Sequence, residues 1–229
     1  MPYSDRLLLT VHGVNSKNDG LAALRQQCEN NLPGLAVDSF FFGKVLPLKE
    51  LTDSVRQFIF RTLRDRIHII NETHLLTQQR KCFIVAHSFG TLAVVRALEM
   101  HVPNLKIEGL VLLGSIVPRD YYWDGLVNGG CLLGPPLVMV RPFDAIVRRA
   151  HIIGGGPSGS DGFIPTGMHR PLEVFKNGGH TAYDPDDSSD VVNAIRNGLQ
   201  SVARKDQATW LGEQSLAMRI ALSLKRVIL

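Results

Sequence analysis

Hydrophobic positions along the chain follow two different periods. Short runs that are apolar at nearly every position are typical of strands buried on both faces, and longer runs with apolar residues three and four apart are typical of amphipathic helices. The short runs predict strands over residues 6–11, 35–42, 82–86, 108–113, 136–141 and 172–176. The helical spacing predicts helices over 18–32, 48–76, 89–101, 188–204 and 208–226, with a short helix after Asp144.

The order of these elements predicts an α/β fold. Strands that are apolar on both faces belong to a parallel sheet that is covered by helices on each side. We therefore expect residues 1–229 to form one domain, a doubly wound and mostly parallel sheet of about six strands with helices on both faces. In such sheets ligands bind beyond the carboxyl ends of the strands, so this is where we expect the chemistry.

Composition and charge narrow the function classes. The 229 residues are 45% hydrophobic and 20% charged, which is typical of a globular protein. The net charge is only +4, and the basic residues are spread along the chain without a nucleic-acid-binding motif, so no nucleic-acid partner is expected. Three cysteines cannot all pair, no stretch has the pattern of a signal peptide, and none approaches the ~18 apolar residues of a membrane span; we expect a cytoplasmic protein.

The strongest chemical signal is the sequence Ala86-His87-Ser88-Phe89-Gly90, which joins an apolar strand to an apolar helix. A serine at such a sharp strand-to-helix turn holds its Oγ above the sheet, and small residues two positions before and after it leave room for the neighbouring chain. The start of the helix behind it favours developing negative charge. The alternative interpretation is that Ser88 only caps the helix.

A serine hydroxyl becomes a good nucleophile when a base removes its proton, and that base needs a carboxylate partner. Asp144 follows the predicted strand 136–141, and His180 follows the predicted strand 172–176 in a glycine-containing loop. We expect Ser88 to be the nucleophile, His180 the base and Asp144 the acid. The alternatives are a helix-capping role for Asp144 and an ordinary surface position for His180, and Asp120, which also follows a strand, is the second candidate for the acid.

The negative charge that develops on a carbonyl oxygen during such a reaction needs donors. The sequence His12-Gly13-Val14 directly follows the first strand. We expect the backbone N–H groups of Val14 and Phe89 to form the oxyanion hole. His12 is expected to be a structural hydrogen-bonding residue that also borders the substrate.

The crossover over about 114–135 is the candidate wall of a substrate pocket. Its apolar stretch contains Tyr122 and Trp123, and with His12 and His87 these are the residues expected to line the pocket. The alternative is that this stretch only packs against the sheet.

Together these segments resemble the serine hydrolases of the α/β-hydrolase fold. The resemblance rests on VHGV at 11–14, IVAHSFGTLA at 84–93, RPFDAIV at 141–147 and GGHTAYD at 178–184. It implies a compact esterase- or lipase-like enzyme that hydrolyses a small-molecule or lipid carboxylic ester through an acyl-enzyme. We expect no cofactor, and no metal either, because the sequence has no His-Glu-x-x-His and no paired cysteine spacing. Two departures are visible: Ala86 replaces the first glycine of the family's usual pentapeptide, and the sheet begins at the strand that the family numbers third.

The same residues are compatible with other functions. The same triad serves thioesterases and lipid acyl hydrolases, and a binding module of the same fold would lack catalysis altogether. Glycines 154, 156 and 159 have the spacing of a dinucleotide-binding motif, but no helix is predicted to open behind them, so we interpret 154–162 as a flexible loop. The basic amphipathic run 208–226 is expected to pack on its own domain, the alternatives being a membrane surface or self-association.

Overall fold

One parallel sheet organises the computed structural model, which describes residues 2–13, 21–42, 51–142, 144–176, 180 and 185–202. Its strands are β1 (Arg6–Val11), β2 (Ala36–Phe40), β3 (Lys81–His87), β4 (Ile107–Leu113), β5 (Leu137–Val140) and β6 (Leu172–Phe175). The order across the sheet is β2-β1-β3-β4-β5-β6, and every neighbouring pair is parallel. The predicted α/β fold with about six parallel strands is confirmed.

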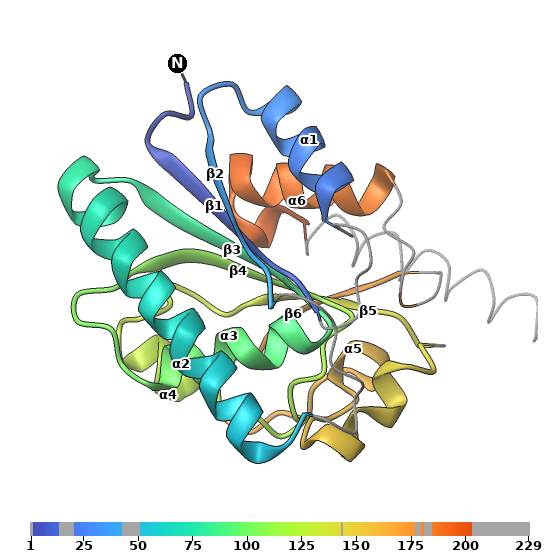
Figure 1. Cartoon of the computed structure of the whole chain (residues 1–229). Coiled ribbons are helices and arrows are strands. Elements are labelled where there is room, and N and C mark those ends of the chain that lie inside the picture. Colours follow the sequence, from blue (N-terminus) through green and yellow to red (C-terminus); the bar gives the residue numbers. More distant parts are fainter. Residues whose placement is uncertain are drawn as a thin grey trace, which may run out of the picture.

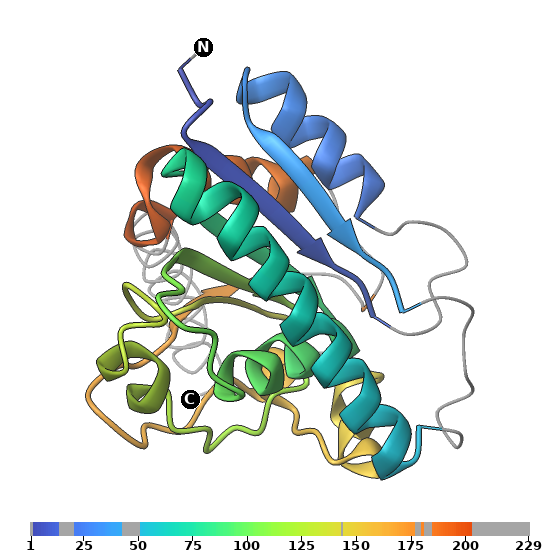
Figure 2. The same ribbon diagram turned by 60° about the vertical axis from the view of Figure 1, so that its left-hand side comes forward.

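Helices cover both faces of the sheet (Figure 1). The helices α1 (Ala22–Asn31) and α6 (Pro185–Asn197) lie together on one face, and α2 (Asp53–Ile70) and α3 (Phe89–Glu99) cover the other, as the turned view also shows (Figure 2). Along β1, Leu7 and Leu9 belong to the core under α2 and α3, whereas Leu8 belongs to the core under α1 and α6. Burial on both faces explains why this strand is apolar at nearly every position.

The predicted helix over 48–76 consists of two elements. The first, α2, begins after Thr52, whose side chain accepts the backbone N–H of Val55 and so caps the helix. It continues without a break into a π-helical segment, η2 (Asn71–Leu76). Residues 43–50 lie outside the described part, as does the predicted helix 208–226.

The connections carry three further short helices: α4 (Asp124–Asn128), η3 (Val147–Ile153) and α5 (Ser158–Asp161). The last of these corrects the prediction of a flexible loop over 154–162. Ser158 and Ser160 are buried there, the Ser158 hydroxyl donates to the Ser115 hydroxyl at 2.9 Å, and the Gly159 N–H donates to the Ser115 carbonyl at 2.7 Å. These tertiary hydrogen bonds hold a helical turn whose composition is typical of a loop.

The chain changes direction across the sheet between β1 and β3. The connection after β1 leads to β2 on one side, and the next connection crosses to β3 on the other side. Connections that diverge in this way leave a crevice at the carboxyl ends of the two central strands. His12 and Gly13 follow the carboxyl end of β1, and Ser88 follows that of β3. Within the described ranges, no helix is both long enough and apolar enough to cross a membrane.

Candidate active site

Ser88 occupies a strained turn between β3 and α3. Its φ of 53° and ψ of −126° are unusual for a residue other than glycine and cost about 1–3 kcal/mol. The Ser88 N–H donates to the Leu113 carbonyl at 3.0 Å, and the Ser88 carbonyl accepts the Thr91 hydroxyl at 2.6 Å. Ser88 is at the N-cap position of α3, but its side chain makes no capping hydrogen bond. The hydroxyl therefore does not serve the helix and is directed elsewhere.

Two glycines make room for this turn. A Cβ on Gly90 would lie 2.6 Å from the carbonyl oxygens of Val11 and His12, so only glycine lets α3 approach the end of β1 so closely. A Cβ on Gly13 would lie 2.7 Å from the Cβ of Ser88 and 3.2 Å from its Oγ. The need for a small residue at position 90 was predicted, whereas the contact between Gly13 and Ser88 was not.

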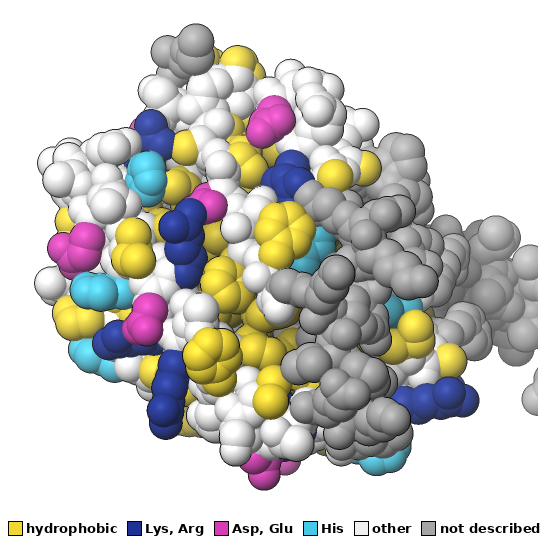
Figure 3. Space-filling view, viewed as in Figure 1, with side chains coloured by type: hydrophobic (Ala, Val, Ile, Leu, Met, Phe, Trp, Pro, Cys, Tyr) yellow, Lys and Arg dark blue, Asp and Glu magenta, His cyan; other side chains and the backbone are white. Residues whose placement is uncertain are grey.

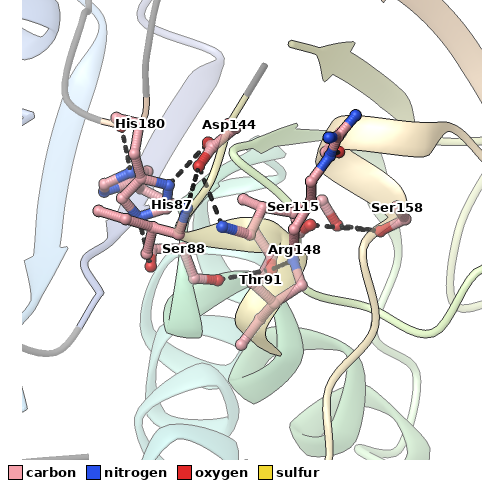
Figure 4. A network of polar contacts seen from close by, with 12 residues as sticks. His87, Ser88, Thr91, Ser115, Asp144, Arg148, Ser158 and His180 are labelled. Carbon is pink, nitrogen blue, oxygen red and sulfur yellow. Dashed lines mark hydrogen bonds and ion pairs between the residues drawn. The ribbon is translucent and has the colours of Figure 1, made fainter. Parts of the chain in front are cut away.

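His180 lies between Ser88 and Asp144 (Figure 4). Its Nε2 is 2.9 Å from the Ser88 Oγ, and its Nδ1 is 2.8 Å from the Asp144 Oδ2. The His180 side chain is 9% exposed and that of Asp144 is fully buried. The three residues follow β3, β5 and β6, so the structure brings together at one edge of the sheet the three side chains that the sequence singled out.

The two carboxylate oxygens of Asp144 have separate partners. Oδ2 faces His180, while Oδ1 accepts the backbone N–H groups of Ile146 and Val147, each at 3.0 Å. Burial alone would raise the pKa of this carboxyl, but the hydrogen bonds from His180 and from the two backbone N–H groups outweigh it and leave the pKa below its usual value. Asp144 therefore stays ionised, and it caps the turn before η3 and faces His180 at the same time. The alternative acid, Asp120, is exposed and lines a groove beside α4.

His12 and His87 are both buried next to these residues. The ring of His12 stacks on the ring of Phe41 at 4.7 Å, and burial, with a smaller contribution from the charge of Arg25, lowers the His12 pKa to about 4. The ring of His87 lies 4.9 Å from the ring of His180, and its Nε2 is 3.2 Å from the His180 carbonyl oxygen. Burial, followed by the charge of His180, lowers the His87 pKa to about 3. Both imidazoles are therefore neutral at neutral pH.

Tyr122 and Trp123 lie away from this arrangement. Trp123 is 2% exposed and packs edge-on against Tyr121 and Phe163, while Tyr122 is 57% exposed and lines a groove of about 650 Å³ beside the end of α3. The reason is the path of the crossover, which runs back to the start of β4, where Leu132 pairs with Ile107. Trp123 thus lies in the core, and Tyr122 lies on the surface beside α4. Neither the groove at Tyr122 nor the small cavity at Trp123 is lined by Ser88, Asp144 or His180.

One expected oxyanion donor lies within the described residues. Phe89 is the first residue of α3, so its backbone N–H has no partner within the helix. Its ring is buried against those of Phe42 and Phe60, which fixes the backbone next to Ser88. The second expected donor, Val14, lies outside the described part of the chain. In that part, no three His, Cys, Asp or Glu side chains come close enough together to hold a metal ion.

No protein-family model matches the chain, and no curated protein is similar to it in sequence. Solved structures are similar in fold. The ydeN gene product of B. subtilis has 17% sequence identity and a TM-score of 0.50, over 85% of this chain and 99% of that one. A zinc-bound, cold-adapted esterase from an Arctic intertidal metagenomic library has 13% identity and a TM-score of 0.52, over 87% and 84% of the two chains.

A third structure gives the same result. The monoacylglycerol lipase of Paleococcus ferrophilus has 15% identity and a TM-score of 0.50, over 86% of this chain and 94% of that one. At such identities a likeness shows the fold and leaves the activity to be argued from the site. From the parallel sheet, the turn at Ser88 and these likenesses, we conclude that the chain has the α/β-hydrolase fold.

Proposed function

We propose that the protein is a serine hydrolase that cleaves a carboxylic ester through an acyl-enzyme. The observation that carries this proposal is the continuous series of contacts from the Ser88 hydroxyl through the His180 imidazole to the Asp144 carboxylate, at 2.9 and 2.8 Å. These are the distances expected of a nucleophile, its base and the group that orients the base. Two of the solved structures with the same fold, an esterase and a lipase, support an ester as the substrate.

The geometry suggests the following reaction. As the Ser88 Oγ attacks the ester carbonyl carbon, its proton passes to the His180 Nε2. Asp144, which accepts the Nδ1–H, keeps the ring in the correct tautomer and stabilises the imidazolium. His180 then donates the proton to the oxygen of the departing alcohol. Water repeats the cycle: it gives a proton to His180, attacks the acyl carbon and releases the acid, and the proton returns to Ser88.

The tetrahedral intermediate carries a negative oxygen, for which the Phe89 N–H and the expected Val14 N–H are the proposed donors. Loss of one such donor typically lowers the rate by about 10²–10³-fold. The position of Ser88 supports this proposal, because Ser88 directly precedes α3 and the N-terminal end of a helix favours developing negative charge.

Exposed hydrophobic side chains near the triad favour an ester with an apolar group. Phe41, which stacks on His12, is 51% exposed, and Ile146, whose N–H donates to Asp144, is 54% exposed. On the face seen in Figure 3, hydrophobic side chains gather near the middle of the molecule, and side chains of Lys, Arg, Asp and Glu lie beside them. An acyl chain or an apolar alcohol would gain about 0.8 kcal/mol per buried methylene on such a surface.

A fluorophosphonate probe tests the proposal, because it phosphonylates only an activated serine. We expect the wild type to be labelled and Ser88→Ala to be unlabelled. Ser189→Ala is the matched control, since Ser189 is exposed on α6 and should leave labelling unchanged. A folded wild type that resists the probe would favour the non-catalytic binding module, and labelling that survives in Ser88→Ala would exclude Ser88 as the nucleophile.

A further inference from the structure

His87 is the last residue of β3 and directly precedes Ser88. Side chains alternate along β3: Ala86 belongs to the core under α2 and α3, and Val85 to the core under α1 and α6. His87 continues this alternation onto the face of α6. The backbone of His87 is fixed by pairing with Leu113 in β4, so its side chain projects from a rigid strand.

His87 contacts both the ring and the backbone of His180. The two rings are 4.9 Å apart and inclined by 40°, and the His87 Nε2 lies 3.2 Å from the His180 carbonyl oxygen (Figure 4). Because a carbonyl only accepts, the His87 Nε2 carries the hydrogen and donates it. One side chain thus fixes the main chain of His180 and also packs against its imidazole.

Gly114 closes another side of the same ring. A Cβ at this position would lie 3.2 Å from the Cε1 and Nδ1 of His180 and 3.5 Å from the Cδ2 of His87. With Ser88 and Asp144 at its two nitrogens, the imidazole of His180 is enclosed by groups from the carboxyl ends of β3 and β4 and from the segment after β5.

The chemistry of this contact suits a histidine. Burial, the nearby charge of His180 and the smaller influence of His12 all disfavour the charged form of His87, while the His180 carbonyl and Asp144 favour it less strongly. A neutral imidazole can therefore donate one hydrogen bond without repelling the imidazolium that forms on His180 during the reaction. A Lys or Arg side chain would donate as well, but it would place a positive charge beside that imidazolium.

We infer that His87 is a positioning residue, which holds His180 in line between Ser88 and Asp144 through the Nε2–H···O=C hydrogen bond and the packing of the two rings. The inference rests on the proposed role of His180 as the base. It explains why a polar side chain is buried at position 87, where the other buried residues of the strand are apolar.

Three variants separate the hydrogen bond from the packing. In His87→Gln the side-chain amide reaches about as far as Nε2, in His87→Asn the same amide is one methylene shorter, and in His87→Phe the ring remains but the donor is lost. We expect His87→Gln, which keeps the donor without the ring, to retain most of the wild-type labelling rate. We expect His87→Asn and His87→Phe to lower the labelling rate and kcat for a nitrophenyl ester by about 10–100-fold with KM unchanged, since a misplaced base costs rate and not binding.

Thermal unfolding midpoints show which variants are folded. If His87→Phe does not fold, the comparison of the Gln and Asn variants, which carry the same side-chain amide, tests the role of the hydrogen bond. Wild-type rates in folded His87→Asn would overturn the inference, and so would equal losses in the Gln and Asn variants. A wild type that is never labelled would instead count against Ser88 as the nucleophile, so the failure of the inference and the failure of the proposed function give different results.

Discussion

Among the residues that the structure describes, two carboxylate–imidazole pairs have nearly the same geometry. In one pair the Asp144 Oδ2 is 2.8 Å from the His180 Nδ1, and in the other the Asp124 Oδ1 is 3.1 Å from the His169 Nδ1. Both aspartates are buried, and each also accepts two backbone N–H groups. By its local contacts alone, either pair resembles the acid and base of a triad.

What separates the two pairs is the rest of their surroundings. The Nε2 of His180 meets the Ser88 hydroxyl at the carboxyl ends of the strands, whereas among the described residues no serine hydroxyl hydrogen-bonds to His169. Asp124 instead accepts the N–H groups of Met168 and His169 and so fixes that segment against α4. A carboxylate–imidazole contact can therefore be purely structural, and the proposed chemical role of the Asp144–His180 pair depends on its contact with Ser88.

The largest expected contrast comes from replacing the two carboxylates. Asp144→Asn should lower kcat by about 10⁴-fold, because an amide in this place favours the wrong tautomer of His180 and cannot stabilise its imidazolium. Asp124→Asn should leave kcat unchanged and lower the thermal unfolding midpoint, because it weakens the acceptor for two backbone N–H groups. Steady-state kinetics and thermal unfolding of the two variants measure the difference, and equal losses of activity would contradict the distinction between the pairs.

Two glycines offer a second contrast. A Cβ on Gly13 would lie 2.7 Å from the Ser88 Cβ, and a Cβ on Gly167 would lie 2.7 Å from the Asp124 carboxylate. We expect Gly13→Ala to lower kcat/KM by about 10²-fold through displacement of Ser88. Gly167→Ala should lower the unfolding midpoint with little change in kcat/KM. Full activity in Gly13→Ala would show that Ser88 does not need its present position.

The pH dependence of stability gives the smallest contrast. His12 and His87 have pKa values of about 4 and about 3 in the folded protein, and in the unfolded chain each would titrate near ~6.5. At pH 5 these two residues alone therefore take up about two protons on unfolding, so the free energy of unfolding falls as the pH drops below ~6.5. Each such proton contributes a slope of ~1.4 kcal/mol per pH unit.

Urea unfolding at pH 7, 6 and 5 measures this slope. His87→Gln should lower this slope by the contribution of about one proton, because one buried histidine is removed. Asp124→Asn should leave it unchanged in this range. Hydrogen bonds from the Met168 and His169 backbone lower the Asp124 pKa, so the stability that this carboxylate provides is lost only at more acid pH. A wild-type stability that does not change between pH 7 and 5 would contradict the buried, neutral state of the two histidines.

Much of the fold could be predicted because burial on both faces leaves a clear pattern. Strands β1, β3 and β4 contain runs of successive apolar residues, and their observed ends lie within one residue of the predicted ends. The turn at Ser88 is encoded locally, since the strand, the serine, Gly90 and the helix follow one another directly.

Other features depend on contacts between distant segments. The hydrogen bond between His87 and His180 joins residues 93 positions apart, and no local pattern at either residue predicts it. The helical turn at Ser158 depends on Ser115 in the same way. For Tyr122 and Trp123, apolar composition indicates burial but does not distinguish a pocket wall from the core, and only the path of the crossover decides between them.

Isolation of the acyl-enzyme tests the role of Ser88 most directly. The protein is mixed with excess nitrophenyl ester, quenched in acid at early times and digested with trypsin, which releases residues 82–96 as one peptide. If Ser88 is the nucleophile, a burst of nitrophenolate of about one equivalent per enzyme is expected when deacylation is slow, with the acyl mass on Ser88. Ester hydrolysis with no acyl mass on this peptide, or an acyl group on another serine, would contradict this role.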